Sequence, residues 1–264
     1  MTENAYWTEA RKSFTEEDLH NFKTWPSVLR VPLYNSFQFE NQYGEDILRM
    51  LPKEADQLEL WKNAVKEPFL GHTEESYAQV KKYIQIGSSI VETTPWALKS
   101  THHVLSYMHN TGRDILDFEQ IVEFGPGIGE TCRVIKDLGF KGDYYLYDLP
   151  EVLRISTYYN KGRTNINGVT HYSQVPNNKK TLFIGTWSIS EIPFEYRDEV
   201  FTYFNEADYL LIYQVNAFEY ANNPYFMIKF PKLINRDIKI VSIPWLSHIA
   251  GGNNYLFVEQ FIDR

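Results

Sequence analysis

A chain of 264 residues with 43% hydrophobic side chains can bury a substantial core without help from metals or disulfides. Its formal net charge of -8 argues against nucleic acid as a partner, because phosphate backbones are bound mainly through accumulated lysine and arginine. The single cysteine, Cys132, excludes an intramolecular disulfide, and no apolar run approaches the roughly 20 residues that cross a bilayer. We therefore expect a cytoplasmic protein that binds neither nucleic acid nor membrane, and self-association into a homo-oligomer stays open.

The first part of the chain carries repeated helix-start signals. Thr15–Asp18 has the pattern of a capping box, and Thr73 opens an acidic first turn. A further helix begins at Pro95 and is closed by Gly112. We predict a helical extension over residues 1–94, rich in aromatic side chains that could cover an acceptor as a lid, and a core over residues 95–264.

From Gln120 onward, short apolar runs alternate with amphipathic stretches, which is typical of a parallel sheet with helices on its faces. Too few residues separate the last two runs for a crossover helix, so they should form an antiparallel hairpin. We expect an α/β protein with a seven-stranded, mostly parallel sheet whose last strand is reversed. The predicted strands are Gln120–Phe124, Tyr144–Tyr147, Val169–Tyr172, Thr181–Thr186, Tyr209–Gln214, Lys239–Ile243 and Tyr255–Gln260.

A glycine-rich turn follows the first predicted strand and opens a helix. Gly125, Gly127 and Gly129 let the backbone turn sharply and approach a ligand, while free amides at the helix start can donate hydrogen bonds to it. A dinucleotide-binding turn needs its third glycine at position 130, where this chain has Glu130, and a carboxylate there would face a pyrophosphate. The turn therefore favours a ligand without phosphate.

The second predicted strand ends in Asp148, 23 positions after Gly125. This spacing is close to the roughly 20 residues expected for the acid that holds the ribose hydroxyls in a nucleoside-binding unit. Together with Glu123 before the glycine turn, the arrangement resembles the class I S-adenosylmethionine-dependent methyltransferases over residues 95–264. The resemblance implies their Rossmann-like fold and S-adenosylmethionine as the cofactor, whose cationic groups tolerate a nearby acid such as Glu130.

The same resemblance implies a role for each cofactor residue. Glu123 would orient the methionine amino group, and Asp148 would hold the ribose hydroxyls. Leu149 would pack on the adenine, while Gln174, after the third strand, is the candidate for the adenine amino group. The residues expected to line the methionine and ribose are Gly125, Gly127 and Gly129.

Two further stretches, Tyr147–Pro150 and Thr186–Pro193, resemble the bacterial sugar O-methyltransferases of capsule and lipopolysaccharide biosynthesis. This resemblance implies a sugar acceptor, nucleotide-linked in our interpretation, for surface polysaccharide biosynthesis. Because the carboxyl ends of parallel strands face the ligand cleft, Ser188, Ser190 and Glu191 should point towards the transferred methyl group. These three residues would serve equally well as a loop and cap before the next helix.

A sugar hydroxyl does not ionise unaided near neutrality, so transfer to it needs a general base. His248 is the first candidate, because the loop between the last two strands should face the cleft, and Glu191 is the second. The adjacent His102 and His103 come next, as substrate contacts or as the base. We expect no metal, because these two histidines and His109 lie mostly on different faces of one helix without an acid cluster.

Three other functions are compatible with parts of this pattern. A small-molecule N-methyltransferase would use the same cofactor site and need no strong base. A nicotinamide-dependent reductase is disfavoured by Glu130. A non-catalytic methyltransferase-like subunit is disfavoured because every cofactor residue is in place.

Overall fold

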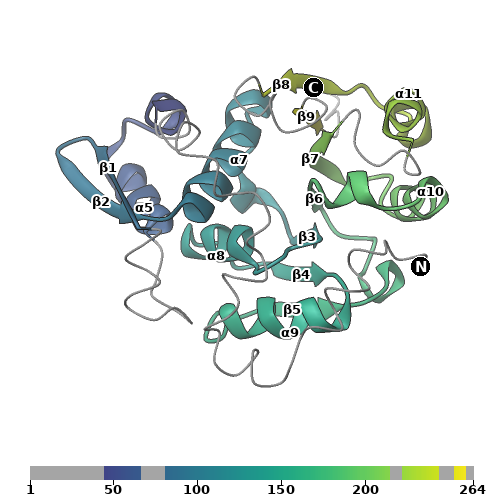
Figure 1. The fold of residues 1–264 in the computed structure, drawn as a ribbon, viewed down its shortest axis with the longest axis horizontal. Helices are drawn as coiled ribbons and strands as arrows, with labels where there is room; N and C mark the ends of the chain where they lie inside the picture. The colour runs from purple at the N-terminus through teal and green to yellow at the C-terminus, as the bar shows by residue number, and fades with distance from the viewer. Residues whose placement is uncertain (1–44, 67–80, 215–221, 244–252, 260–264) are drawn as a thin grey trace.

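The structure, a computed structural model, describes residues 45–66, 81–214, 222–243 and 253–259. Its centre is a seven-stranded sheet with the order β5-β4-β3-β6-β7-β9-β8 (Figure 1). The first five strands in this order pair in parallel, whereas β9 is antiparallel to both of its neighbours. The predicted mostly parallel sheet with a reversed last strand is therefore confirmed. The strands are β3 (Gln120–Phe124), β4 (Asp143–Tyr147), β5 (Ile166–Val169), β6 (Thr181–Thr186), β7 (Asp208–Gln214), β8 (Lys239–Ser242) and β9 (Asn253–Val258).

Helices cover both faces of this sheet, and each face has its own hydrophobic core. One core joins the sheet to α7, α8 and α9, and the other joins it to α10 and α11. None of the helices in the described ranges is both long enough and apolar enough to span a bilayer. The helices are α7 (Pro95–Thr111), α8 (Glu130–Asp137), α9 (Pro150–Tyr159), α10 (Phe194–Tyr203) and α11 (Asn223–Ile234), with short 3-10 turns η2 (Ile115–Asp117), η3 (Tyr172–Gln174) and η4 (Ser188–Glu191).

Helix α7 begins and ends where the sequence predicts. The side chain of Thr94 accepts a hydrogen bond from the amide of Ala97 over 3.3 Å, and Pro95 occupies the first turn. Gly112 closes the helix with φ of 70°, a left-handed conformation that glycine adopts without strain. This helix carries the two histidines of the predicted acceptor site.

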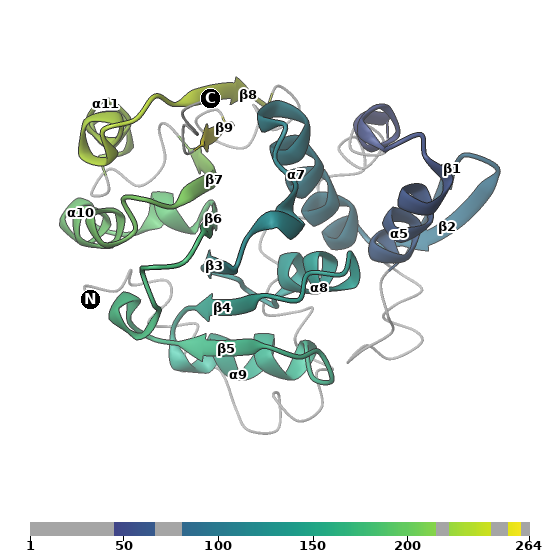
Figure 2. The same cartoon turned by 180° about the vertical axis from the view of Figure 1, so that it is seen from behind.

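An outer layer formed by α5 (Ala55–Val65) and a β-hairpin lies on the far side of α7 and α8 from the sheet (Figures 1 and 2). The hairpin pairs β1 (Lys82–Ile86) with β2 (Ser89–Thr93), so residues 82–93 of the predicted helical extension form a β-hairpin. Apolar and polar side chains alternate along this stretch, and Gly87, with φ of 61°, provides the turn. The predicted helix starts at Thr15–Asp18 and Thr73 lie outside the described residues.

The third strand also lies earlier than predicted, at Ile166–Val169 instead of Val169–Tyr172. The side-chain oxygen of Gln174 accepts hydrogen bonds from the amides of Thr170 and His171, over 2.8 and 2.9 Å. These bonds fold the chain into η3 directly after Val169, because amides held by a local side chain are not available to a strand partner.

Candidate active site

The carboxyl ends of β3 and β6 lie side by side at the point where the chain changes the face of the sheet. After β3 the chain enters α8 on one face, whereas after β6 it enters α10 on the other. Ligands of open α/β sheets bind in the crevice at such a switch point. The two segments that follow these strands, residues 125–129 and 187–191, therefore form the candidate site.

The glycines after β3 have the conformations that a close approach requires. Gly125, Gly127 and Gly129 all have positive φ, of 67°, 56° and 84°. A Cβ at position 125 would collide with the side chain of Ser188, whereas a Cβ at position 127 would meet no atom within 4 Å. The backbone of Gly127 thus borders open space, as expected where a ligand lies against the turn.

The segment after β6 is tied to its neighbours by two serine hydroxyls. Ser188 donates a hydrogen bond to the carbonyl oxygen of Phe124 over 2.6 Å, and the buried Ser190 accepts one from the amide of Gln214 over 3.0 Å. Trp187, between β6 and these serines, has φ of 63°. Both predicted acceptor contacts therefore hold the strand ends together, and a direct contact with the acceptor stays a prediction.

Asp148 is held beside the glycine turn. Its carboxylate accepts a hydrogen bond from the amide of Leu149 over 2.7 Å, and the amide of Gly127 lies near enough to stabilise its charge. Burial raises the pKa of this carboxyl to about 7 although both amides lower it, and the negative charge of Glu191 adds to the rise. The structure thus brings together four predicted site residues from the loops after β3, β4 and β6. They are Gly127, Asp148, Leu149 and Glu191.

Glu123 is buried one residue before the end of β3 and accepts a hydrogen bond from the hydroxyl of Tyr144 over 2.9 Å. Burial raises the pKa of its carboxyl to about 8, and the charges of Asp148 and Glu130 add to this rise. A cation placed beside Glu123 would favour its ionised form, because opposite charges attract strongly where water is excluded.

Glu130, at the start of α8, is turned away from the ligand space. It accepts hydrogen bonds from the guanidinium of Arg133, over 2.5 to 3.0 Å, and from the hydroxyl of Tyr159, over 2.6 Å. The same guanidinium donates to the carbonyls of Ala64 and Lys66 and so fixes the end of α5 to α8. Glu130 therefore has structural partners in Arg133 and Tyr159.

Gln174 is exposed, and its side-chain oxygen is occupied by the amides that end β5. Its predicted contact with the adenine amino group therefore gains no support from the geometry. His248 lies outside the described residues, so its predicted role as the base stays a prediction.

His102 and His103 are buried against β9, where the Nδ1 atoms of both rings lie within 2.7 and 2.5 Å of the Tyr255 hydroxyl. A hydroxyl has one proton, so it can donate to one ring and must accept from the other. Asp46, from helical residues 45–50, lies 3.7 Å from the Nε2 atom of His102. No local sequence pattern marks Asp46 or Tyr255, because only the tertiary fold brings them to the histidines.

Burial lowers the pKa of both histidines, and for His103 the neighbouring charges of His102 and Lys99 lower it further. Both shifts favour the neutral imidazole. The ring of His103 lies 5.4 Å from the ring of Trp187, measured between centroids. The histidine pair is therefore connected to the segment after β6.

No family model matches this sequence, and no curated protein matches it. Among solved structures, the chain is similar to the Methanococcus jannaschii fibrillarin pre-rRNA processing protein, with 15% identity over 69% of this chain and 84% of that chain and a TM-score of 0.45. It is also similar to a ribosomal protein L11 methylase from Lactobacillus delbrueckii, with 12% identity over 61% of this chain and 79% of that chain and a TM-score of 0.42. A third similar structure is a precorrin-6y C5,15-methyltransferase from Geobacter metallireducens, with 11% identity over 53% of this chain and 80% of that chain and a TM-score of 0.40. Likenesses this distant assign no function, which must come from the site itself.

The switch-point residues fit a nucleoside with a cationic arm. Open space borders the Gly127 backbone, and the Asp148 carboxylate beside it can accept hydrogen bonds from vicinal hydroxyls. The pKa values of Asp148 and Glu123 are raised mainly by burial, which outweighs the hydrogen bonds that the two carboxylates accept.

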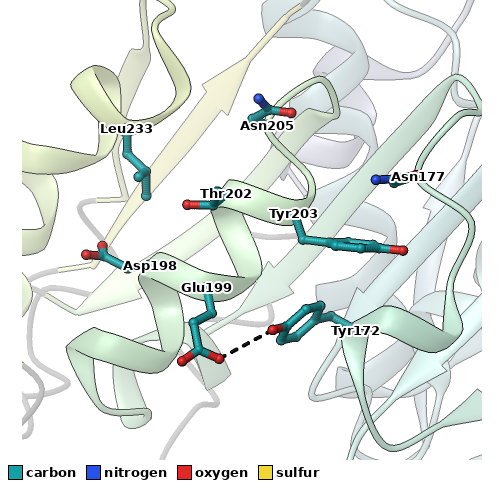
Figure 3. Close-up of a pocket in the computed structure, with 8 residues that line it drawn as sticks. All are labelled: Tyr172, Asn177, Asp198, Glu199, Thr202, Tyr203, Asn205 and Leu233. Carbon is teal, nitrogen blue, oxygen red and sulfur yellow. Dashed lines mark hydrogen bonds between the residues drawn. The ribbon is translucent and has the colours of Figure 1, made fainter.

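A separate cavity of about 600 Å³ lies between η3 and α10 (Figure 3). Glu199 and Tyr172 face each other across it, with the Tyr172 hydroxyl 3.4 Å from the Glu199 carboxylate. None of the predicted site residues lines this cavity. Its lining residues are Tyr172, Asn177, Asp198, Glu199, Thr202, Tyr203, Asn205 and Leu233.

Proposed function

We propose that this protein is a methyltransferase that uses S-adenosylmethionine. The observation that carries the proposal is the position of the Asp148 carboxylate at the end of β4, near the Gly127 backbone and the open space beside it. A carboxylate fixed at this place suits the vicinal hydroxyls of a ribose, and the glycine backbone suits a ligand that lies flat against it.

The chain's own residues account for cofactor recognition. Asp148 would accept hydrogen bonds from the ribose hydroxyls, Leu149 would border the adenine, and Glu123 would pair with the methionine amino group. When bound, S-adenosylmethionine supplies an electrophilic methyl group on a sulfonium ion. The protein then needs to align the acceptor and to remove its proton.

We propose a sugar hydroxyl, nucleotide-linked and destined for surface polysaccharide, as the acceptor. The resemblance of Tyr147–Pro150 and Thr186–Pro193 to sugar O-methyltransferases supports this class. A neutral base near the cleft suits a hydroxyl acceptor, and the buried pair His102 and His103 is such a group beside Trp187. Glu191, close enough to Asp148 to influence its charge, is a second candidate.

Calorimetry with S-adenosylmethionine, S-adenosylhomocysteine and NADH tests the cofactor. We expect the two adenosyl compounds to bind and NADH not to bind; binding of NADH alone would reject the proposal. Mass spectrometry of methyl transfer to a panel of nucleotide-sugars then tests the acceptor. Transfer to small amines but to no sugar would assign the protein as an N-methyltransferase.

A further inference from the structure

Lys99, in the second turn of α7, has an unusual environment. Its side chain is half-buried, and its Nζ atom lies 4.9 Å from the centroid of the Trp187 ring. Within the described ranges, the ammonium makes no hydrogen bond and no ion pair. Burial lowers the pKa of Lys99 to about 8, although the charges of Glu130 and Glu123 oppose this shift. An ammonium that loses part of its hydration without gaining a hydrogen-bonded partner destabilises the protein that contains it.

The nearby carboxylates do not compensate for the lost hydration of the Lys99 ammonium. Glu130 is held by Arg133 and Tyr159, and Glu123 is held by Tyr144. Neither carboxylate comes within ion-pair distance of Lys99, so each acts on the ammonium only through its field. The most direct way to satisfy Lys99 is an anionic group from a ligand.

The contacts of Trp187 place Lys99 at the switch point. Trp187 precedes Ser188, which bonds to Phe124 at the end of β3, and Phe124 separates Glu123 from the glycine turn. The site thus has a cationic side chain from α7 and, once a cation beside Glu123 favours its ionised form, an anionic side chain from β3. Opposite charges on two sides of one site match a zwitterion, whose amino and carboxylate groups are both charged at neutral pH.

We propose that Lys99 binds the carboxylate of the cofactor's amino-acid portion, while Glu123 pairs with its amino group. This inference rests on the proposed function, since it requires an adenosyl ligand with an amino-acid arm. It assigns to α7 a part in cofactor recognition that no local sequence pattern marks.

The test uses two adenosyl ligands that differ in this arm. S-adenosylhomocysteine carries the amino and carboxylate groups, whereas 5′-methylthioadenosine has the same nucleoside without them. We expect Lys99→Met to weaken S-adenosylhomocysteine by about 10- to 100-fold, the range for a lost charge-assisted hydrogen bond, and to leave 5′-methylthioadenosine within about twofold. Lys99→Arg, which keeps the charge, should retain most of the affinity.

Thermal unfolding of the ligand-free variant adds a second readout. Lys99→Met should unfold at the same or a higher temperature than the wild type, because it removes an unsatisfied desolvated charge. The matched control is Lys161→Met, since Lys161 also lies over a ring, that of Tyr158, at 4.2 Å but on the exposed surface. This control should change the affinity of neither ligand.

The other possible outcomes of the binding measurements separate this inference from the proposed function. Equal weakening of both ligands by Lys99→Met, or no weakening of either, would overturn the role of Lys99 while leaving the proposed function intact. If the wild-type protein binds neither ligand, the proposed function fails, and this inference fails with it.

Discussion

The hydroxyl of Ser188 donates a 2.6 Å hydrogen bond to the carbonyl oxygen of Phe124 and so joins the ends of β6 and β3 at the switch point. The two strands pair in parallel up to Phe124 and Gly185, so this bond extends their contact beyond the sheet. Gly125 has no room for a side chain because Ser188 occupies that space. The two loops of the candidate site are therefore built as one unit.

Ser188→Ala should lower the free energy of unfolding by about 1 kcal/mol, because it removes one intramolecular hydrogen bond. Ser173→Ala is the control, since Ser173 is exposed and bonds only locally to His171. Urea denaturation of both variants measures the difference. A Ser188→Ala protein with wild-type stability and a raised KM for the acceptor would instead show that Ser188 contacts the substrate.

Gly127→Ala should abolish most of the cofactor affinity without a matching loss of stability. The new methyl group meets no protein atom, so the folding cost is limited to the left-handed backbone, about 1 to 2 kcal/mol. Gly112→Ala is the matched control, because Gly112 also has positive φ and open space but caps α7. Both variants should lose similar stability in thermal unfolding, while only Gly127→Ala should lose binding of S-adenosylhomocysteine in calorimetry. Equal affinities in the two variants would show that no ligand lies against Gly127.

Cofactor binding should depend on the ionisation of Asp148. Its pKa is about 7 in the ligand-free protein, and hydrogen bonds from a ribose would stabilise the charged form and lower that pKa. Affinity should therefore rise with pH up to about 7 and then level off. The ligand 5′-methylthioadenosine isolates this effect, because it has no amino-acid groups to titrate. Asp148→Asn should bind it at least about tenfold more weakly at pH 8 and without this pH dependence. A pH-dependent Asn variant would assign the titration to another group.

Tyr255→Phe should destabilise the fold by about 1 to 3 kcal/mol, because two buried imidazole nitrogens lose their shared hydroxyl. Tyr145→Phe is the control, since Tyr145 is half-buried in β4 and makes no hydrogen bond through its hydroxyl to any described residue. Denaturant unfolding compares the two. If Tyr255→Phe is as stable as the control, the histidine pair does not depend on this hydroxyl.

The features that could be predicted from the sequence are those set by a few neighbouring residues. Thr94, Pro95 and Gly112 define α7 through local capping, and the glycine turn needs only its own backbone to adopt positive φ. Asp148 follows from its position at the end of a strand. Local backbone preferences and spacing within one β-α-β unit are enough for each of these conclusions.

The features that could not be predicted depend on residues far apart in the chain. Tyr255 meets His102 and His103 across more than 150 positions, and the Lys99 ammonium lies over the ring of Trp187, 88 positions later in the chain. The hairpin over residues 82–93 is a different case, since its alternating pattern and Gly87 are visible in the sequence but were outweighed by the helix-start signals on either side.

The position of β9 makes the order of synthesis matter. This strand comes last in the described chain but lies between β7 and β8, so neither of those strands has its inner partner until residues 253–258 leave the ribosome. A chain that stops earlier carries two unpaired strand edges, which favour aggregation and recognition by quality-control proteases. It also lacks Tyr255, so the histidines on α7 have no hydroxyl to share. Residues 253–258 thus complete both the sheet and the histidine cluster, and a chain terminated before them can form neither.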